Sequence, residues 1–159
     1  MKSITILCPS SLDKDQDIKL LHNKYTKRLS AHIDWPKLNI KLHFNDSADL
    51  VKKKQGEALL QAIEKWPQNS FVIALDENGK YLSSLEFAEE LENKTIMGQS
   101  HFCFIIGGAY GLPDSILDKC DLKLSFGKMV WPHRLVSVML LEQLYRAQQI
   151  LAGHPYHKE

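Results

Sequence analysis

Two uninterrupted apolar runs, FVIAL at residues 71–75 and FCFII at residues 102–106, constrain the fold of this chain more than any other feature of its sequence. A strand with one solvent-facing side alternates apolar and polar residues, whereas a continuous apolar run is typical of a strand covered on both faces. Each run is followed by a segment with helical apolar spacing. This pattern predicts an α/β domain with a largely parallel sheet and helices on both faces.

The rest of the chain continues the same alternation. Further strands are expected at residues 3–8, 38–44 and 122–126, and the strict apolar–polar alternation of 38–44 indicates a strand with one buried face. Asn78–Gly79 is expected to turn the chain. Helices are expected to begin at five capping or first-turn residues: Asp13, Asp46 or Ser47, Ser83 with Glu86 as a capping box, Pro113, and Pro132, the last helix ending near Gly153.

The length and charge narrow the class of protein. A chain of 159 residues suits one domain, spanning 1–159. Its net charge is +1, with residues 1–69 at +4 and residues 70–159 at −3. This excludes a strongly basic nucleic-acid-binding domain, so a polyanionic partner must be met by a local patch or by one assembled between subunits.

No membrane, secretion or metal signal is present. The C-terminal apolar stretch is interrupted by Arg134, Glu142 and Arg146, and the apolar N-terminus is too short for a signal peptide. The three cysteines are an odd number without a CxxC pair, so we expect free thiols and no metal site. These features favour a cytoplasmic protein with no membrane partner.

Three loops are expected to meet at the carboxyl ends of the strands, where ligands bind in sheets of this kind. They are residues 76–80, the GGAYG loop at 107–111, and residues 127–133. The GGAYG loop has neither the dinucleotide spacing G-x-G-x-x-G nor the Lys of a P-loop. By itself it is equally compatible with a ligand site and with a plain turn.

Two other segments carry chemistry. The tail holds two imidazoles and a phenol within residues 154–157, and a histidine can act as a base near neutral pH. The run of lysines at 52–54 is compatible with a solvated helix face or with phosphate contact.

Taken together, five motifs resemble one family. They are LDENGKYLSSLEFAEEL at 75–91, IIGGAYGLP at 105–113, LSFGKMVWPHRLV at 124–136, LEQLYRAQQILAGHPYHKE at 141–159, and KQGEALL at 54–60. In order and register these resemble the RlmH family, small SPOUT-class methyltransferases that act on 23S ribosomal RNA. The resemblance spans essentially the whole chain.

The resemblance implies S-adenosylmethionine as cofactor and N3 of a pseudouridine as the methylated atom. The implied substrate is a 23S rRNA stem-loop at the subunit interface, methylated on assembled ribosomes, with no DNA partner. It further implies a homodimer and a C-terminal trefoil knot that forms the cofactor site.

The resemblance also assigns residues. The cofactor is expected to contact Leu75, Gly107 and the backbone of Phe126, Gly127, Lys128, Met129, Val130 and Trp131. Tyr156 and His157 are the candidates for a base or an orienting group, and Arg146 for stabilising the substrate anion or gripping phosphate. We expect the tail of one subunit to complete the site of its partner.

Two departures keep other functions open. Residues 7–10 read LCPS where the family usually has a Val-Gly-Lys turn, and Ser137 stands where the family usually has Arg. Arg134, one helical turn earlier, is expected to supply that charge. The alternatives are a catalytically inactive ribosome- or RNA-binding factor and a nucleotide-binding α/β protein.

Overall fold

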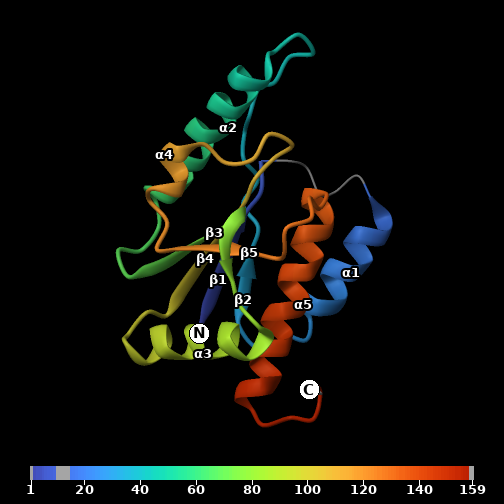
Figure 1. Cartoon of the computed structure of the whole chain (residues 1–159), viewed down its shortest axis with the longest axis vertical. Coiled ribbons are helices and arrows are strands. Elements are labelled where there is room, and N and C mark those ends of the chain that lie inside the picture. The colour runs from blue at the N-terminus through green and yellow to red at the C-terminus, as the bar shows by residue number, and fades with distance from the viewer. Residues whose placement is uncertain (1, 10–14, 158–159) are drawn as a thin grey trace.

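The computed structural model describes residues 2–9 and 15–157. Within them, five parallel strands form one sheet in the order β2-β1-β4-β3-β5 (Figure 1). The strands are β1 Ser3–Leu7, β2 His32–Asp34, β3 Ser70–Tyr81, β4 His101–Ile106 and β5 Leu122–Ser125. The helices are α1 Gln16–Thr26, α2 Ala48–Ile63, α3 Ser84–Ile96, α4 Asp114–Leu117 and α5 His133–Leu151. The predicted parallel α/β domain is confirmed.

The two apolar runs form β3 and β4, inside the sheet, and the side chains of each strand point alternately into two cores. Phe71 and Ile73 of β3 face a core shared with α1, α3 and α5, whereas Val72 and Ala74 face a core shared with α2 and α4. The same alternation holds along β4. Since successive strand residues point to opposite faces, an unbroken apolar run is what a doubly covered strand requires.

The strand expected at residues 38–44 is wrong. The edge of the sheet is instead the three-residue β2, whose His32 lies opposite Ser3 of β1. Pro36 follows directly, and a proline has no N–H to donate to a ladder. Residues 35–43 therefore run without strand pairing, and the alternating apolar residues do not form a buried face, because Leu42 and Phe44 are exposed.

The helix caps are mostly where the sequence predicts them. Ser47 accepts a hydrogen bond from the Leu50 N–H at the start of α2, and the capping box of Ser83 and Glu86 is formed. Pro132 precedes α5, as expected. Asp15 caps α1, and the cap predicted at Asp13 lies outside the described residues.

The turn expected at Asn78–Gly79 is formed within β3 and does not end the strand. β3 continues to Tyr81 through an irregular stretch, in which Leu75 and Lys80 both lie opposite Leu124 of β5. A Cβ on Gly79 would lie 2.7 Å from the backbone of Lys123, so only glycine allows this close approach of the two strands. The extra residues bulge outward at the carboxyl edge of the sheet.

At the opposite edge of the sheet, His101 joins three strands. Its Nε2 lies 2.9 Å from Thr5 Oγ1 and its Nδ1 lies 2.7 Å from Ser70 Oγ. Ser70 donates to the Pro67 carbonyl, so it must accept from Nδ1–H. Burial lowers the pKa of His101 from the ordinary 6.5, which favours the neutral ring, and in the neutral ring Nε2 accepts from the Thr5 hydroxyl.

This arrangement predicts a loss of stability in acid. Because the folded pKa of His101 lies below its unfolded value, the neutral ring's contribution is complete above that unfolded value and declines as the pH falls through it. The His101→Gln variant should show a smaller drop in unfolding free energy than the native chain between about pH 7.5 and about pH 5.5. Urea denaturation measures this, with the exposed His32→Gln as control. Equal drops in native chain and His101→Gln would contradict the account.

Candidate functional site

A cleft of about 910 Å³ lies at the carboxyl ends of the strands. Residues 75–78, 106–112, 126–127 and 129–133 line it, together with Lys52 of α2. The three loops expected to converge do so, because all five strands run parallel and end at the same edge. Of the residues assigned to the cofactor, these line the cleft: Leu75, Gly107, Phe126, Gly127, Met129, Val130 and Trp131. Lys128 belongs to the same loop but not to the lining.

The GGAYG loop is a tight turn that favours glycines. The Gly111 N–H donates to the Gly108 carbonyl at 3.1 Å, and Gly111 has a φ of +71°. A Cβ on Gly107 would lie 3.1 Å from the backbone of Gly111, and one on Gly108 would lie 2.6 Å from Gln55 Oε1. The loop therefore brings bare backbone to the cleft wall.

Ser125, at the end of β5, ties two of the loops together. Its buried hydroxyl accepts from the Gly127 N–H at 3.2 Å and lies 3.1 Å from the carbonyl oxygens of both Glu77 and Gly127. Gly127 has a φ of +115°, a conformation that side-chain-bearing residues rarely adopt. The bulge of β3 and the loop before α5 are thus fixed relative to each other.

One polar atom in the wall of the cleft has no partner. His133 opens α5 and lines the cleft, and its buried Nε2 makes no hydrogen bond to the described residues. Burial, followed by the charge of Arg134, lowers the pKa of His133, so the ring is neutral. Buried polar atoms are normally hydrogen-bonded, so the lack of a partner for this nitrogen among the described residues is unusual.

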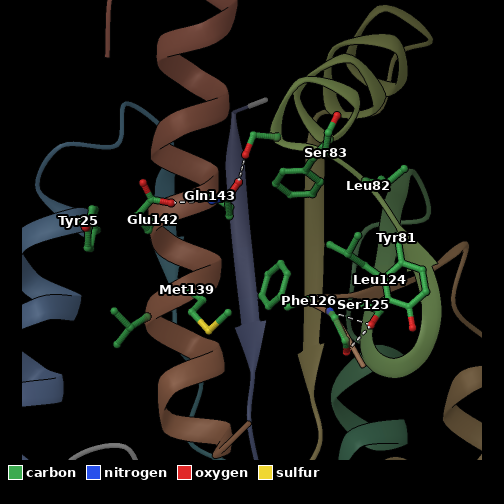
Figure 2. A pocket seen from close by; sticks show the side chains of 14 residues that line it. Tyr25, Tyr81, Leu82, Ser83, Leu124, Ser125, Phe126, Met139, Glu142 and Gln143 are labelled. Atoms are coloured by element: carbon green, nitrogen blue, oxygen red, sulfur yellow. Dashed lines mark hydrogen bonds between the residues drawn. The ribbon is translucent and has the colours of Figure 1, made fainter. Parts of the chain in front are cut away.

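A second cavity, of about 560 Å³, lies between α3 and α5 and shares Leu124, Phe126 and Gly127 with the cleft. Figure 2 shows Met139, Glu142 and Gln143 on its α5 side. Gln143 accepts a hydrogen bond from Ser84 Oγ and donates one to Glu142, each at 2.7 Å. This chain of contacts links the start of α3 to the middle of α5.

The three predicted catalytic residues meet around a residue that sequence reasoning missed. Glu142 Oε1 lies 2.7 Å from Arg146 Nη2 and accepts from the Tyr156 hydroxyl at 3.2 Å. His157 Nδ1 lies 3.4 Å from Arg146 Nη1. The tail therefore folds back on α5. A Glu four residues before an Arg on one helix face was the signal that could have identified Glu142.

These contacts fix the protonation of two groups. The hydrogen bond that Arg146 donates to Glu142 raises the pKa of Arg146, and burial, followed by the charge of Glu142, raises the pKa of Tyr156. Both groups keep their protons at neutral pH. Tyr156 is therefore a hydrogen-bond donor in this arrangement, which suits orientation rather than proton abstraction.

The cluster of Glu142, Arg146, Tyr156 and His157 lies far from the first turn of α5. His133, in the cleft wall, and Arg146 are thirteen residues apart on α5, and a helix rises 1.5 Å per residue, which separates them by about 20 Å along its axis. Figure 1 shows the last turns of α5 on the side of the molecule where α3 lies, away from α2. The cluster and the cleft are thus two candidate half-sites.

Ser137 faces inward and not toward the cleft. Its fully buried hydroxyl donates to the Arg134 carbonyl at 2.6 Å and accepts from His22 Nε2 of α1 at 2.7 Å, and the His22 ring stacks on Trp35. Through these two hydrogen bonds, Ser137 connects the first turn of α5 to α1. Compensation by Arg134 stays a prediction, as does the effect of the altered first loop, whose Ser10 lies outside the described residues.

Two of the three cysteines are poor nucleophiles at neutral pH. All three are free thiols, and burial raises the pKa of Cys103 to about 12 and that of Cys120 to about 11. Within residues 2–9 and 15–157 no cluster of three or more His, Cys, Asp or Glu side chains is arranged to hold a metal ion. In the same residues, no helix has the length and hydropathy needed to cross a membrane.

Comparison with known proteins gives one consistent result. A family model described as "Predicted SPOUT methyltransferase" matches residues 2–157. A "Ribosomal RNA large subunit methyltransferase H" from Clostridium novyi (strain NT) is 42% identical over 166 residues, covering 98% of this chain and 99% of the relative. A relative of the same name from Clostridium botulinum (strain Okra / Type B1) is 44% identical over 154 residues, covering 91% of this chain and 93% of the relative. Another, from Carboxydothermus hydrogenoformans, is 52% identical over 111 residues, covering 70% of this chain and 68% of the relative.

The contacts of Glu142 predict that it holds the tail. Glu142→Ala removes both the partner of Arg146 and the acceptor of Tyr156, so amide hydrogen exchange in residues 153–157 should accelerate by about fivefold, the equivalent of about 1 kcal/mol.

Glu90→Ala is the matched control, because it breaks the i,i+4 contact between Glu90 and Lys94 on α3 without touching the tail. If the tail exchanges at the native rate in Glu142→Ala, Glu142 is not its anchor.

Proposed function

Because this chain belongs to the RlmH family of SPOUT methyltransferases, we propose that it methylates the RNA of the large ribosomal subunit, with S-adenosylmethionine as methyl donor. The methylated atom is N3 of a pseudouridine in a 23S rRNA stem-loop at the subunit interface. The observation that carries the proposal is the cleft, which is formed by the same three loops that hold the family's motifs.

The residues of the cleft fit this cofactor. Its volume of about 910 Å³ lies in the range of small-molecule sites. Met129, Val130 and Trp131 offer apolar walls for an aromatic base, while Asp76 and Asn78 offer polar contacts. Leu75, Gly107 and the backbone of residues 126–131, Lys128 included, would hold it. When bound, S-adenosylmethionine supplies a methyl group already activated by its sulfonium.

The chain must bring the nucleophilic nitrogen to that methyl group and accept its proton. Tyr156, a neutral donor, suits the orientation of the base. His157, whose Nδ1 lies 3.4 Å from Arg146 Nη1, stays the candidate proton acceptor, because an imidazole can accept a proton near neutral pH. Arg146 is placed to stabilise the anion left on the imide or to contact a phosphate.

The distance between the half-sites supports a homodimer. Methyl transfer requires near contact, and about 20 Å along α5 separates the cluster from the cleft of its own subunit. The tail of one subunit therefore completes the cleft of its partner. Exposed apolar side chains on α1 and α5 suit a subunit contact: Leu20, Leu21, Leu135 and Leu151. The trefoil knot stays a prediction from the resemblance.

The charge supports an assembled ribosome as the substrate. A net charge of +1 gives little affinity for naked RNA, which is bound mainly through its phosphates. Recognition of the assembled particle by shape requires less charge. The nucleotide-binding alternative is disfavoured, because the glycines of GGAYG are explained by close packing and lack the dinucleotide spacing.

The tail predicts a separation of binding from catalysis. A variant lacking residues 154–159 should bind S-adenosylmethionine with unchanged affinity, measured by calorimetry. Its methyl transfer to ribosomes from a strain without the protein should fall by about a hundredfold, since it loses the acid–base groups. Transfer at the native rate would contradict the role of the tail.

The same assay tests the function itself, with assembled ribosomes, large subunits and free rRNA offered to the native chain. Label on N3 of a pseudouridine, chiefly in assembled ribosomes, is the expected result. Cofactor binding without label on any substrate would favour the inactive binding factor. A chain that does not bind S-adenosylmethionine is not a methyltransferase of this kind.

A further inference from the structure

The segment before α2 holds an aromatic side chain entirely in solvent. Phe44 has a relative exposure of 104%, and its neighbour Leu42 is also exposed. Figure 1 shows this segment and α2 extending from the body of the molecule, at the end opposite α3. Within the described residues no other large apolar side chain is as exposed, so Phe44 has no packing role in the folded chain.

The turn that carries Phe44 is built and not merely irregular. The Asp46 N–H donates to the His43 carbonyl at 3.1 Å, and the Asp46 carboxylate accepts from the His43 N–H at 2.9 Å. Lys54 of α2 contacts the same carboxylate oxygen at 2.7 Å, which ties the turn to the helix. The hydrogen bonds from His43 and Lys54 lower the pKa of Asp46. Phe44 is thus presented at the tip of an anchored turn.

The charge around the turn differs from that of the whole chain. Residues 37–54 contain five lysines and two aspartates, a net charge of +3, whereas the whole chain carries +1. The carboxylate of Asp46 forms an ion pair with Lys54, and Asp49 lies in the first turn of α2. Lys52 lines the cleft and Lys53 is exposed, so positive charge connects the turn to the cleft.

The turn lies within reach of a substrate bound at the cleft. Four residues separate Phe44 from the start of α2, and Lys52 is four residues into the helix, so the two lie at most about 20 Å apart. A stem-loop whose target base enters the cleft therefore has neighbouring nucleotides within range of Phe44.

We propose that Phe44 stacks on an unpaired base of the RNA substrate, while Lys41, Lys52 and Lys53 contact its phosphates. This rests on the proposed function and names the surface that the substrate contacts. Unpaired RNA loops are recognised by stacking on aromatic side chains, and lysines supply the phosphate contacts. The positive charge favours RNA over an apolar pocket of a ribosomal protein, which would require no lysines.

Three substitutions at Phe44 test this assignment. Phe44→Ala and Phe44→Leu should each weaken ribosome binding, measured by cosedimentation, and raise the KM for ribosomes in methyl transfer, both by about tenfold, because the stacking surface is lost. Phe44→Trp should restore both quantities. The affinity for S-adenosylmethionine should not change in any of the three, since Phe44 does not line the cleft.

Ile96→Ala is the matched control. Ile96 is 77% exposed at the end of α3, so its substitution removes a similar apolar surface far from α2. It should leave binding and KM unchanged. Lys53→Gln should reduce the salt dependence of ribosome binding by about one counterion.

Two results would overturn the proposal. If Phe44→Ala binds and turns over ribosomes as the native chain does, Phe44 makes no contact. If Phe44→Leu retains native affinity while Phe44→Ala loses it, the contact is an apolar protein pocket and not a base. Cosedimentation does not depend on methyl transfer, so a failure of the proposed function leaves the test of Phe44 intact.

Discussion

The pairing of β3 with β4 is the interaction on which the rest of the molecule depends. Six residue pairs, from Ser70 with His101 to Leu75 with Ile106, hold the two strands in parallel register. Because both are apolar on both faces, this pair requires helices on each side of the sheet, and a parallel sheet requires each connection to return over a face. The carboxyl ends of the strands, and the loops that follow them, consequently lie at one edge. The cleft is the result of that topology.

The same topology explains why the molecule holds its chemistry in two places. α5 begins in the cleft wall and carries the tail to its far end, where Glu142 gathers Arg146 and Tyr156. The helix fixes a separation of about 20 Å between His133 and Arg146. In the proposed homodimer, a second copy of the chain would bring a tail to each cleft. The exposed Phe44 turn would then extend the surface offered to the proposed RNA substrate.

Much of the fold and of the cleft could be predicted from local patterns. The apolar runs identified the central strands, Ser83 and Glu86 identified the start of α3, and strand order along the chain placed three loops at one edge. The alternating pattern of residues 38–44 led to a wrong prediction. Such a segment forms a strand only where a neighbouring strand has a free edge, and β2 already occupies the edge of β1. Asn78–Gly79 indicated the turn but not the continuation of β3 beyond it, which depends on the close contact of Gly79 with β5. Glu142 was missed because its partners lie fourteen residues away in the tail as well as on its own helix.

The most direct test of a site shared between subunits is a mixed dimer. One subunit lacks residues 154–159, and the other carries Ala109→Trp, which fills its cleft from an exposed position on the GGAYG loop. Each homodimer should be inactive in methyl transfer to ribosomes. The mixed dimer, purified with two different tags, should recover about half the native rate, because it holds one intact cleft opposite one intact tail. A mixed dimer as inactive as its parents would contradict the account, since it would mean that each subunit uses its own tail.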